Sequence, residues 1–502
     1  MLIVLMLAVG IAVTMVSTIL VAEVDRSSSP GSVTRWVLSA VLALFSGIYV
    51  NLVLAAIVRV WRRPEAPDTT VNAVIDTARR WLRKKRRWAA IVLTIAAIVA
   101  TGVALRPAPP PDLGLEEGGL VIMTAQDEST DDPRTALVNQ WNEAYPDHRA
   151  TVKYVAGEPD QQNAAMVNDA KPDGAHEADV YVLDIVWMEQ FVKRGYVQEL
   201  DGSRPVDRDD FVDKVLDTCT DDEQRLWALP FNTDVGMLYH RGDVEKPTSW
   251  ADYFGPAAAA LAQADGTPGV EAANAAQLAD EEILTVTALE AMWAAGGEAF
   301  SAKGTVTQNE DKTAVQLDSA DRSGIDLLVA ASHDSDIVLT EEARSTTDNS
   351  AVTMFAEGRT MFLRNWPVAY DNLVDKAEFK VEVAEPPSAS VLGGQNLAVS
   401  ATTDKPRAAR ALIEFLTSSP SQLILAEMGG FAPTRESAYE DTGRAELGQV
   451  RTALNKARLR PVTEHYVEFS RVFREGIAHA LDDPNGQLKA GFLEELAKIL
   501  NR

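Results

Sequence analysis

The chain opens with three long apolar runs, at residues 2–24, 36–58 and 88–105. The first contains one acidic residue near its end, and the other two contain no charged residue. Each run approaches the roughly 20 residues that a helix needs to cross a bilayer core. None shows the polar stripe of an amphipathic surface helix. The pattern therefore predicts three transmembrane helices.

The charges beside these runs predict their orientation. The segment between the second and third runs ends in ARRWLRKKRRW (78–88), with seven basic residues among eleven. Such a cluster stays on the cytoplasmic side of a membrane. We therefore expect a cytoplasmic N-terminus, a short external loop at 23–35, and everything after Leu105 outside the cell. The same cluster could bind nucleic acid, but its place beside a membrane span favours lipid head groups.

A proline-rich segment, RPAPPPDLGLEEGG (106–119), follows the third run. Four prolines among its first six residues favour an extended, stiff spacer. The first run lacks a basic flank and a cleavage pattern, so it is interpreted as a retained span and not as a signal peptide. The expected organisation is a membrane anchor at 1–106, a linker at 107–119 and a folded external domain at 120–502.

After the linker, apolar strands alternate with helical patterns. Short links between such elements indicate a parallel sheet with helices on its faces. The expected strands are LVIMTA (120–125), ATVKYVAG (150–157) and ADVYVLD (178–184). The expected helices begin at Pro133, at Asp160 in DQQNAAMVNDA and at Ile185 in IVWMEQFVKRGYV.

The second half of the domain has a different pattern. Residues 256–300 are rich in alanine and are expected to be helical, including a long helix that stops at Gly296 and Gly297. Strand patterns return in TMFLRNW, FKVEVAE and LGGQNLAVS, and residues 404–502 are expected to be almost entirely helical. Two α/β units joined by strand crossovers fit this alternation better than one continuous sheet.

Several acidic residues stand where ligands bind in such sheets, outside the carboxyl ends of the strands. Asp127 and Glu128 follow the first expected strand, and Asp184 ends the third. Either these carboxylates contact a ligand, or they cap the helices that follow.

The stretch MFLRNWPVAY places a tryptophan at the end of an apolar strand, directly before a proline that ends it. Strand alternation puts Arg364 and Trp366 on one face and Asn365 on the other. An arginine on that face predicts that the face is partly exposed to water. Trp366 would then project into a binding cleft, with Arg364 as its polar neighbour. The alternative is an ordinary core tryptophan.

Charge and composition narrow the possible partners. The formal net charge is −26, and residues 1–106 carry 13 Lys and Arg against 5 Asp and Glu, so the acidity belongs to the external part. This argues against nucleic acid as its partner and favours a neutral ligand. A single cysteine, Cys219, and six histidines without a ligand pattern give metal chemistry no support. No P-loop is present, and no cofactor is expected.

Nine stretches together resemble the family 1 extracellular solute-binding proteins of ABC transporters, in the branch that takes up trehalose, maltose and related sugars. They occur in the family's order: DQQNAAM, ADVYVLDIVWMEQFVKRGYVQELD, LWALPFNTDVGMLYHR, PTSWADY, FAEGRTMFLRNWPVAY, SVLGGQNLAVS, ARALIEFLTSSPSQ, GGFAPTRESAY and RPVTEHY.

The resemblance implies an α/β, two-lobed periplasmic-binding-protein fold of type II, the Venus-flytrap fold, here preceded by three transmembrane helices. Chain crossings between the lobes are then expected near 230–236, 380–390 and 428–440. The first lobe would contain about 120–232 and 385–432, and the second about 237–384 and 433–502.

A neutral sugar presents hydroxyl groups, which carboxylates and amides bind, and apolar faces, which stack on aromatic rings. The resemblance places these contacts on Asp127, Glu128, Gln162, Asp184, Asn232, Asp234, Trp366, Gly393, Gly394, Gln395, Asn396 and Arg460, beside the Arg364 deduced from the strand. The two glycines would let backbone N–H groups approach the ligand.

The chain departs from the family in two respects. Some relatives have an aromatic residue after LGG where this chain has Gln395, and Gram-positive members are usually anchored through a lipid-modified cysteine that is missing here.

The resulting hypothesis is a membrane-tethered extracellular protein, not an enzyme, that delivers a disaccharide or short oligosaccharide to the permease subunits of an ABC transporter with a separate ATPase. The membrane lipid would contact only the N-terminal helices. Two alternatives remain open on the sequence. One is a membrane-tethered sugar sensor acting on a partner protein, and the other is a surface glycosidase, which would need a pair of carboxylates roughly 5–10 Å apart.

Overall fold

The computed structural model describes residues 114–126, 129, 132–200, 207–264, 269–298, 300, 306–308, 312–483 and 485–502. The chain divides into two compact units, 1–111 and 112–502. The three expected transmembrane helices, the spacer up to residue 113, Asp127 and Glu128 all lie outside the described residues. Within the described ranges, no helix is both long enough and apolar enough to cross a membrane.

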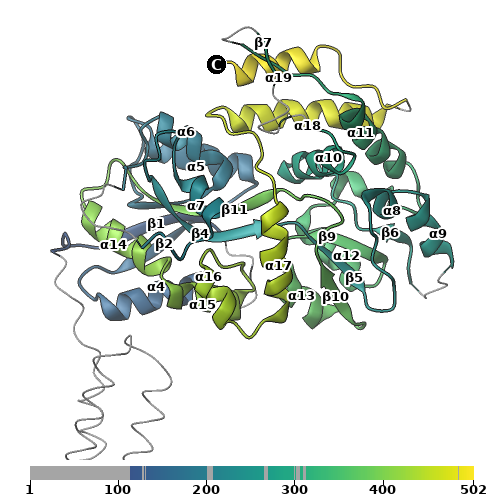
Figure 1. The fold of residues 1–502 in the computed structure, drawn as a ribbon. Helices are drawn as coiled ribbons and strands as arrows, with labels where there is room; N and C mark the ends of the chain where they lie inside the picture. Colours follow the sequence, from purple (N-terminus) through teal and green to yellow (C-terminus); the bar gives the residue numbers. More distant parts are fainter. Residues whose placement is uncertain are drawn as a thin grey trace, which may run out of the picture. The chain divides into compact units, whose positions relative to one another are not determined.

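A five-stranded sheet in the order β2-β1-β3-β11-β4 forms the centre of the first lobe (Figure 1). The pairs β1–β2 and β1–β3 are parallel, as the alternating pattern predicted, whereas β11 pairs antiparallel with β3 and β4. The strands are β1 (Leu120–Ala125), β2 (Ala150–Val155), β3 (Val180–Asp184), β4 (Ala228–Val235) and β11 (Leu392–Val399).

Helices that pack against this sheet complete the first lobe. Pro133 and Pro159 each stand in the first turn of a helix, where a missing N–H has no cost. The helices are α4 (Pro133–Ala144), α5 (Pro159–Ala170), η1 (Ile185–Trp187), α6 (Met188–Lys193), α7 (Asp213–Leu216), η2 (Asp217–Cys219), α14 (Pro406–Leu416), α15 (Ser419–Gly429) and α16 (Glu436–Asp441). Their buried core contains Trp141, Tyr181 and Phe191.

The second lobe is built on a four-stranded sheet in the order β10-β5-β9-β6. Its strands are β5 (Met237–Arg241), β6 (Ala272–Asn274), β9 (Thr360–Asn365) and β10 (Val381–Ala384), and a separate hairpin pairs β7 (Val306–Gln308) with β8 (Lys312–Ala314). The strand β6 was not predicted, because its alanines favour a helix and only parallel pairing with β9 makes them a strand.

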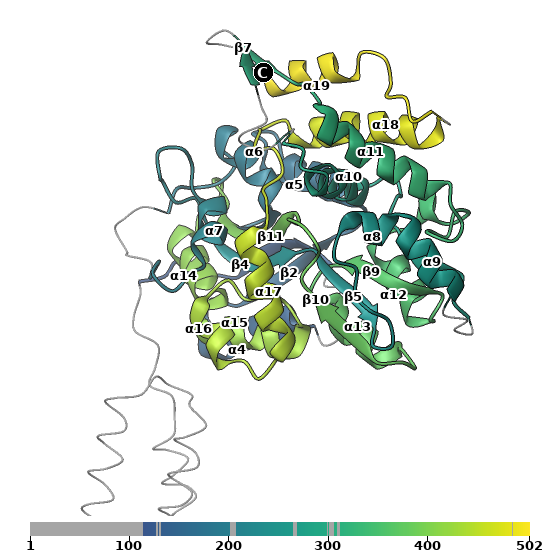
Figure 2. The same cartoon turned by 45° about the vertical axis from the view of Figure 1, so that its right-hand side comes forward.

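Among the described residues, nine helical segments belong to the second lobe, and α18 packs against α10, α11 and α19 (Figure 2). They are α8 (Trp250–Phe254), α9 (Pro256–Ala264), α10 (Glu282–Ala294), α11 (Ser319–Ser332), η3 (Ala343–Ser345), α12 (Asp348–Ala356), α13 (Ala369–Lys376), α18 (Tyr466–Asp482) and α19 (Phe492–Leu500). Phe362, Phe469 and Phe473 are fully buried in its core. The expected stop of α10 before Gly296 and Gly297 is confirmed.

The chain passes between the lobes at three places that lie close together. Gly236 joins β4 of the first sheet to β5 of the second. The segment after β10 leads back to β11, and there Ser390 and Leu392 exchange backbone hydrogen bonds with Arg458, each 2.8 Å long. The helix α17 (Ala445–Lys456) lies between the lobes in both views.

The third passage lies further along the chain than expected. Ser437 N donates to Asp210 Oδ1 at 2.9 Å, and Thr434 N donates to the buried Gln422 at 2.7 Å. These contacts keep α16 with the first lobe, so the chain leaves that lobe after Asp441 and not within 428–440. Buried apolar residues from both sheets and from α17 pack together in a separate cluster.

Candidate functional site

Three of the predicted site residues lie in one row across the first sheet. In the strand register, Gln395 of β11 stands opposite both Asp184 of β3 and Asn232 of β4. Residues that are directly opposite one another in paired strands project to the same face of the sheet. The row therefore brings together an amide, a carboxylate and a second amide near the carboxyl ends of β3 and β4.

Asp234 extends this row along β4. Asn232 Nδ2 donates to Asp234 Oδ2 at 3.1 Å, and Asp234 Oδ1 is buried without a hydrogen-bond partner among the described atoms. Burial raises the pKa of the Asp234 carboxyl to about 7, and Asp184 adds to the rise while Arg134 and Arg364 oppose it. Asp234 is thus a carboxyl group that can gain or lose a proton near neutral pH.

The sequence analysis missed Arg134, the second residue of α4. Its buried guanidinium donates to Asn232 Oδ1 and to Thr124 Oγ1, both at 3.4 Å, and also to Gln395 Oε1. The guanidinium lies 5.1 Å from the centroid of the Phe431 ring. A signal was available, because α4 directly follows the first strand and its first turn must face the carboxyl edge of the sheet.

Arg460 connects the row to the second lobe. Its Nη2 donates to Asp184 Oδ1 at 3.1 Å, and its Nη1 donates to Glu282 Oε1 at 2.7 Å. Glu282 begins α10 and also accepts hydrogen bonds from Tyr466 and Ser470 of α18. Asp184 in addition accepts from Val186 N at 3.0 Å and so caps η1, as one of its two interpretations expected, while its contact with a ligand stays a prediction.

Two further arginine contacts join the lobes. Arg474 of α18 donates to Asp160 of α5 at 2.7 Å and lies 3.6 Å from Asp280. Arg194, after α6, pairs with Glu464 at 2.9 Å. The described structure therefore has the two lobes in direct contact.

Trp366 stands directly after β9, which ends at Asn365. The ring is partly buried, and a Cβ atom at Gly393 of the first lobe would lie 3.3 Å from its Cζ3 atom. The indole thus reaches the strand that carries Gln395. Its role in ligand stacking remains a prediction.

The expectation that Arg364 lies on a wet face is wrong. Arg364 is buried, and its Nε and Nη2 atoms donate to Glu290 Oε2 at 3.0 Å and Oε1 at 2.6 Å. An arginine on a strand face indicates water only if no buried carboxylate balances its charge. Glu290, in the apolar helix α10, is that carboxylate, and the sequence analysis missed it.

Two other predicted contacts, Asn396 and Gln162, form hydrogen bonds outside the row. Asn396 projects to the opposite face from Gln395, where its Nδ2 donates to Thr218 O at 3.2 Å and to Thr218 Oγ1 at 3.0 Å. It is fully buried and acts as a core hydrogen-bonding residue. Gln162, in the first turn of α5, donates to Gly157 O at 2.7 Å. Within the described part of the chain, neither side chain forms a hydrogen bond with a residue of the row.

The glycines at 393 and 394 serve the packing of the protein itself. Gly394 has φ +122°, and a Cβ there would lie 2.5 Å from the Asn232 carbonyl oxygen. A Cβ at Gly393 would lie 3.2 Å from the Asp234 Cβ. Close approach of β4 and of the Trp366 ring therefore requires these glycines. The expected contact of their backbone N–H groups with a ligand stays a prediction.

Solved structures share this two-lobed α/β arrangement, the periplasmic-binding-protein fold. Maltose-bound MalE3 from T. maritima matches with a TM-score of 0.65 and 23% identity, over 76% of this chain and 99% of that one. The GacH receptor of Streptomyces glaucescens, solved unliganded and with acarbose, matches with a TM-score of 0.62 and 21% identity, over 77% and 97%. A solute-binding protein from Thermotoga lettingae bound with α-D-tagatose matches with a TM-score of 0.64 and 18% identity, over 76% and 99%.

Sequence comparison gives the family. Residues 136–450 match the model of the bacterial extracellular solute-binding proteins, and the chain belongs to this family. A probable ABC transporter-binding protein from Deinococcus radiodurans is 28% identical over 361 residues, which cover 65% of this chain and 81% of the relative. The protein is accordingly a binding protein and not an enzyme, so the glycosidase considered above is not its function.

Proposed function

We propose that the protein captures a sugar outside the cell, as a disaccharide or a short oligosaccharide, and delivers it to the permease of an ABC transporter whose ATPase is a separate subunit. The observation that carries this proposal is the row of Asp184, Gln395, Asn232 and Asp234, which stands beside the ring of Trp366. Carboxylates accept hydrogen bonds from hydroxyl groups, amides both accept and donate them, and an indole offers a flat apolar surface to the sugar ring.

Three neighbours support the chemical class of the ligand. Their structures contain maltose, acarbose and α-D-tagatose, and the Deinococcus relative is a probable ABC transporter-binding protein. Asp127, Glu128 and Gln162 stay in the proposal as contacts that become part of the site when a sugar is bound. Arg460 would contact the sugar through the hydrogen-bonding capacity of its buried Nε, which has no partner among the described atoms.

Thermal unfolding of the full chain in detergent, with a panel of mono-, di- and trisaccharides, tests the proposal. A sugar at one hundred times its dissociation constant should stabilise the domain by about 2.7 kcal/mol. We expect a disaccharide to do so. Trp366→Ala should reduce the shift by weakening the binding, whereas Tyr154→Ala, at an exposed aromatic residue, should retain it. An unchanged shift in Trp366→Ala contradicts the stacking role, and no shift with any sugar contradicts the function.

The proposal includes the anchor. Residues 1–106 would form three transmembrane helices with a cytoplasmic N-terminus, and 107–119 would hold the binding domain, 120–502, away from the lipid. Its lobes would contain about 120–232 with 385–432, and about 237–384 with 433–502. The contacts of α16 assign the residues up to Asp441 to the first lobe instead of the second. We expect the full chain to remain in the membrane pellet after carbonate washing and a chain starting at residue 107 to be released. External protease should degrade the domain on intact cells, and protection of it would contradict this orientation.

A further inference from the structure

Glu290 is a buried carboxylate in the middle of the apolar helix α10. Its two oxygens accept four hydrogen bonds. Two come from Arg364, at 3.0 and 2.6 Å, and the others come from Ser390 Oγ at 2.5 Å and Val391 N at 2.9 Å. A carboxylate in this position is tolerated only with its charge and its lone pairs satisfied, so the four donors must keep their places.

Two of these donors belong to the segment that returns the chain to the first lobe, just before β11. The other lobe passage contacts the same group, since a Cβ at Gly236 would lie 2.3 Å from Ser390 Oγ and 2.4 Å from Arg364 Nη2. The Glu290–Arg364 pair therefore touches both strand passages between the lobes.

Arg364 also supports the indole of Trp366. Its guanidinium carbon lies 4.0 Å from the centroid of the Trp366 ring, and its backbone N donates to the hydroxyl of Tyr253 at 3.0 Å. The planar guanidinium covers one face of the ring and is attracted to its electron-rich face. Only the other face of the indole is then left for a sugar.

We propose that Glu290 and Arg364 are positioning residues, which hold the Trp366 ring and join it to both strand passages without touching the ligand. Glu290 fixes the guanidinium through its two hydrogen bonds, and the guanidinium fixes the ring. This inference rests on the proposed sugar-binding function. Arg364, which was expected to contact the sugar, would instead contact the indole ring that binds it.

A double-mutant cycle on the full chain, with maltose as the probe in calorimetry, tests the inference. We expect Glu290→Gln to weaken maltose binding about tenfold in the natural background and less than twofold in the Trp366→Ala background, because its effect passes through the ring. Equal losses in both backgrounds would show that the pair acts on the sugar or on the fold without Trp366, and would overturn the inference. Glu271→Gln removes a similar carboxylate from Arg359 at the other end of β9 and should leave the affinity unchanged.

A ligand-free measurement separates this inference from the sugar-binding proposal. The Trp366 emission is obtained as the difference between the natural chain and Trp366→Phe, and its quenching by acrylamide reports how firmly the ring is held. We expect Glu290→Gln and Arg364→Lys each to raise that quenching about twofold, the second while keeping the positive charge. Arg364→Lys keeps the positive charge beside Glu290 and loses only the planar guanidinium. Unchanged quenching in this variant would overturn the positioning role even if no sugar binds.

Discussion

At the scale of single residues, Asp234 couples the candidate site to pH. Its Oδ1 atom is buried without a partner among the described atoms, and burial raises its pKa to about 7. Because the folded state holds this proton up to higher pH than the unfolded chain does, the folded state binds more protons between about pH 4 and 7. Asp234 therefore costs increasing stability as the pH rises through this window, and the full cost is present above pH 7.

This gives a prediction for Asp234→Asn. The free energy of unfolding of the natural chain, minus that of the variant, should fall by about 2 kcal/mol between pH 5 and pH 7 and stay level above pH 8. Urea denaturation at each pH measures it. Asp221→Asn is the control. Burial tends to raise the pKa of Asp221, but hydrogen bonds from Arg225 and Trp227 lower it to about 2. The contribution of Asp221 to stability therefore changes only in more acidic solution. A level difference for Asp234→Asn across pH 5–7 would contradict the prediction.

The sequence predicted those residues of the site that a motif marks, and it missed those whose partners are distant along the chain. Asp184 followed from the rule that ligands meet strand ends, Asn232 and Gln395 followed only from the family resemblance, and the strand register brings the three together. Arg134 and Glu290 did not follow, since their partners lie 98 and 74 positions away along the chain and only tertiary packing brings them together. Arg364 shows the same limit, because its face was judged wet without knowledge of Glu290.

At the scale of elements, side-chain hydrogen bonds join helices to strands where backbone ladders end. Gln422 of α15 is fully buried. Its Nε2 donates to the carbonyl of Phe231 in β4 at 2.7 Å, and its Oε1 accepts from Thr434 N at 2.7 Å and Thr434 Oγ1 at 2.9 Å. One side chain thus ties a helix, a strand of the site and the segment leading to α16.

We therefore expect Gln422→Leu to lower the free energy of unfolding by about 3 kcal/mol, because it leaves a buried carbonyl and a buried N–H without partners while keeping a similar volume. The midpoint of urea denaturation, at constant slope, measures this loss. Gln162→Leu, which removes one exposed hydrogen bond to Gly157, should change stability by less than about 0.5 kcal/mol. Equal effects of the two substitutions would show that the buried connection is unimportant.

Elements themselves were predicted where local pattern and tertiary environment agree. β1 and α4 begin at Leu120 and Pro133 as expected, because an apolar run and a helix-starting proline leave little choice. β6 was missed because Ala272 and Ala273 favour a helix, and only the neighbouring β9 makes them a strand. β11 is antiparallel to its neighbours because the chain returns to the first lobe from the second, which no local pattern reveals.

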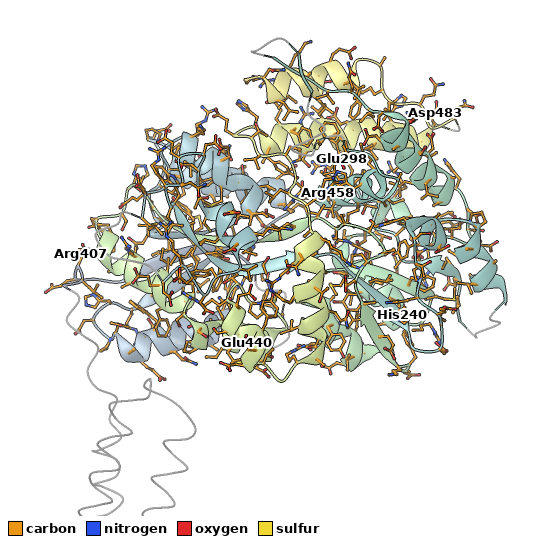
Figure 3. All side chains as sticks on the ribbon, viewed as in Figure 1. His240, Glu298, Arg407, Glu440, Arg458 and Asp483 are labelled. Carbon is orange, nitrogen blue, oxygen red and sulfur yellow. The ribbon has the colours of Figure 1, made fainter. Side chains whose placement is uncertain are left out.

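At the scale of the whole molecule, charges meet where the lobes touch. Arg474 pairs with Asp160 of the first lobe and lies near Asp280 of the second. Arg194 of the first lobe likewise pairs with Glu464 of the second, whereas Arg458, marked in Figure 3, bonds to Glu298 within the second lobe. The lobes are thus in contact through pairs that a hinge motion would have to separate.

One contact between the lobes joins two acids. Burial and the neighbouring Glu158 raise the pKa of Glu281 to about 6, while Arg474 opposes the rise. Glu158 precedes α5 in the first lobe, and Glu281 precedes α10 in the second. Below about pH 6 a shared proton allows the two carboxyl groups to remain together. Above it Glu281 becomes charged beside Glu158, which opposes that charge, and the repulsion favours separation of the lobes.

The ligand-free protein should therefore open as the pH rises from 5 to 8. Spin labels at Asp173→Cys and Glu357→Cys, exposed positions in the two lobes, would report the change as a longer distance in pulsed EPR on the full chain. The natural Cys219 is buried, and burial raises the pKa of its thiol, so it should not take up label. Glu281→Gln keeps the shape but cannot ionise, and it should hold the distance at its pH 5 value throughout. If the distance in the unsubstituted background is the same at pH 5 and pH 8, the carboxyl pair does not control opening, and the arginine contacts alone determine how the lobes meet.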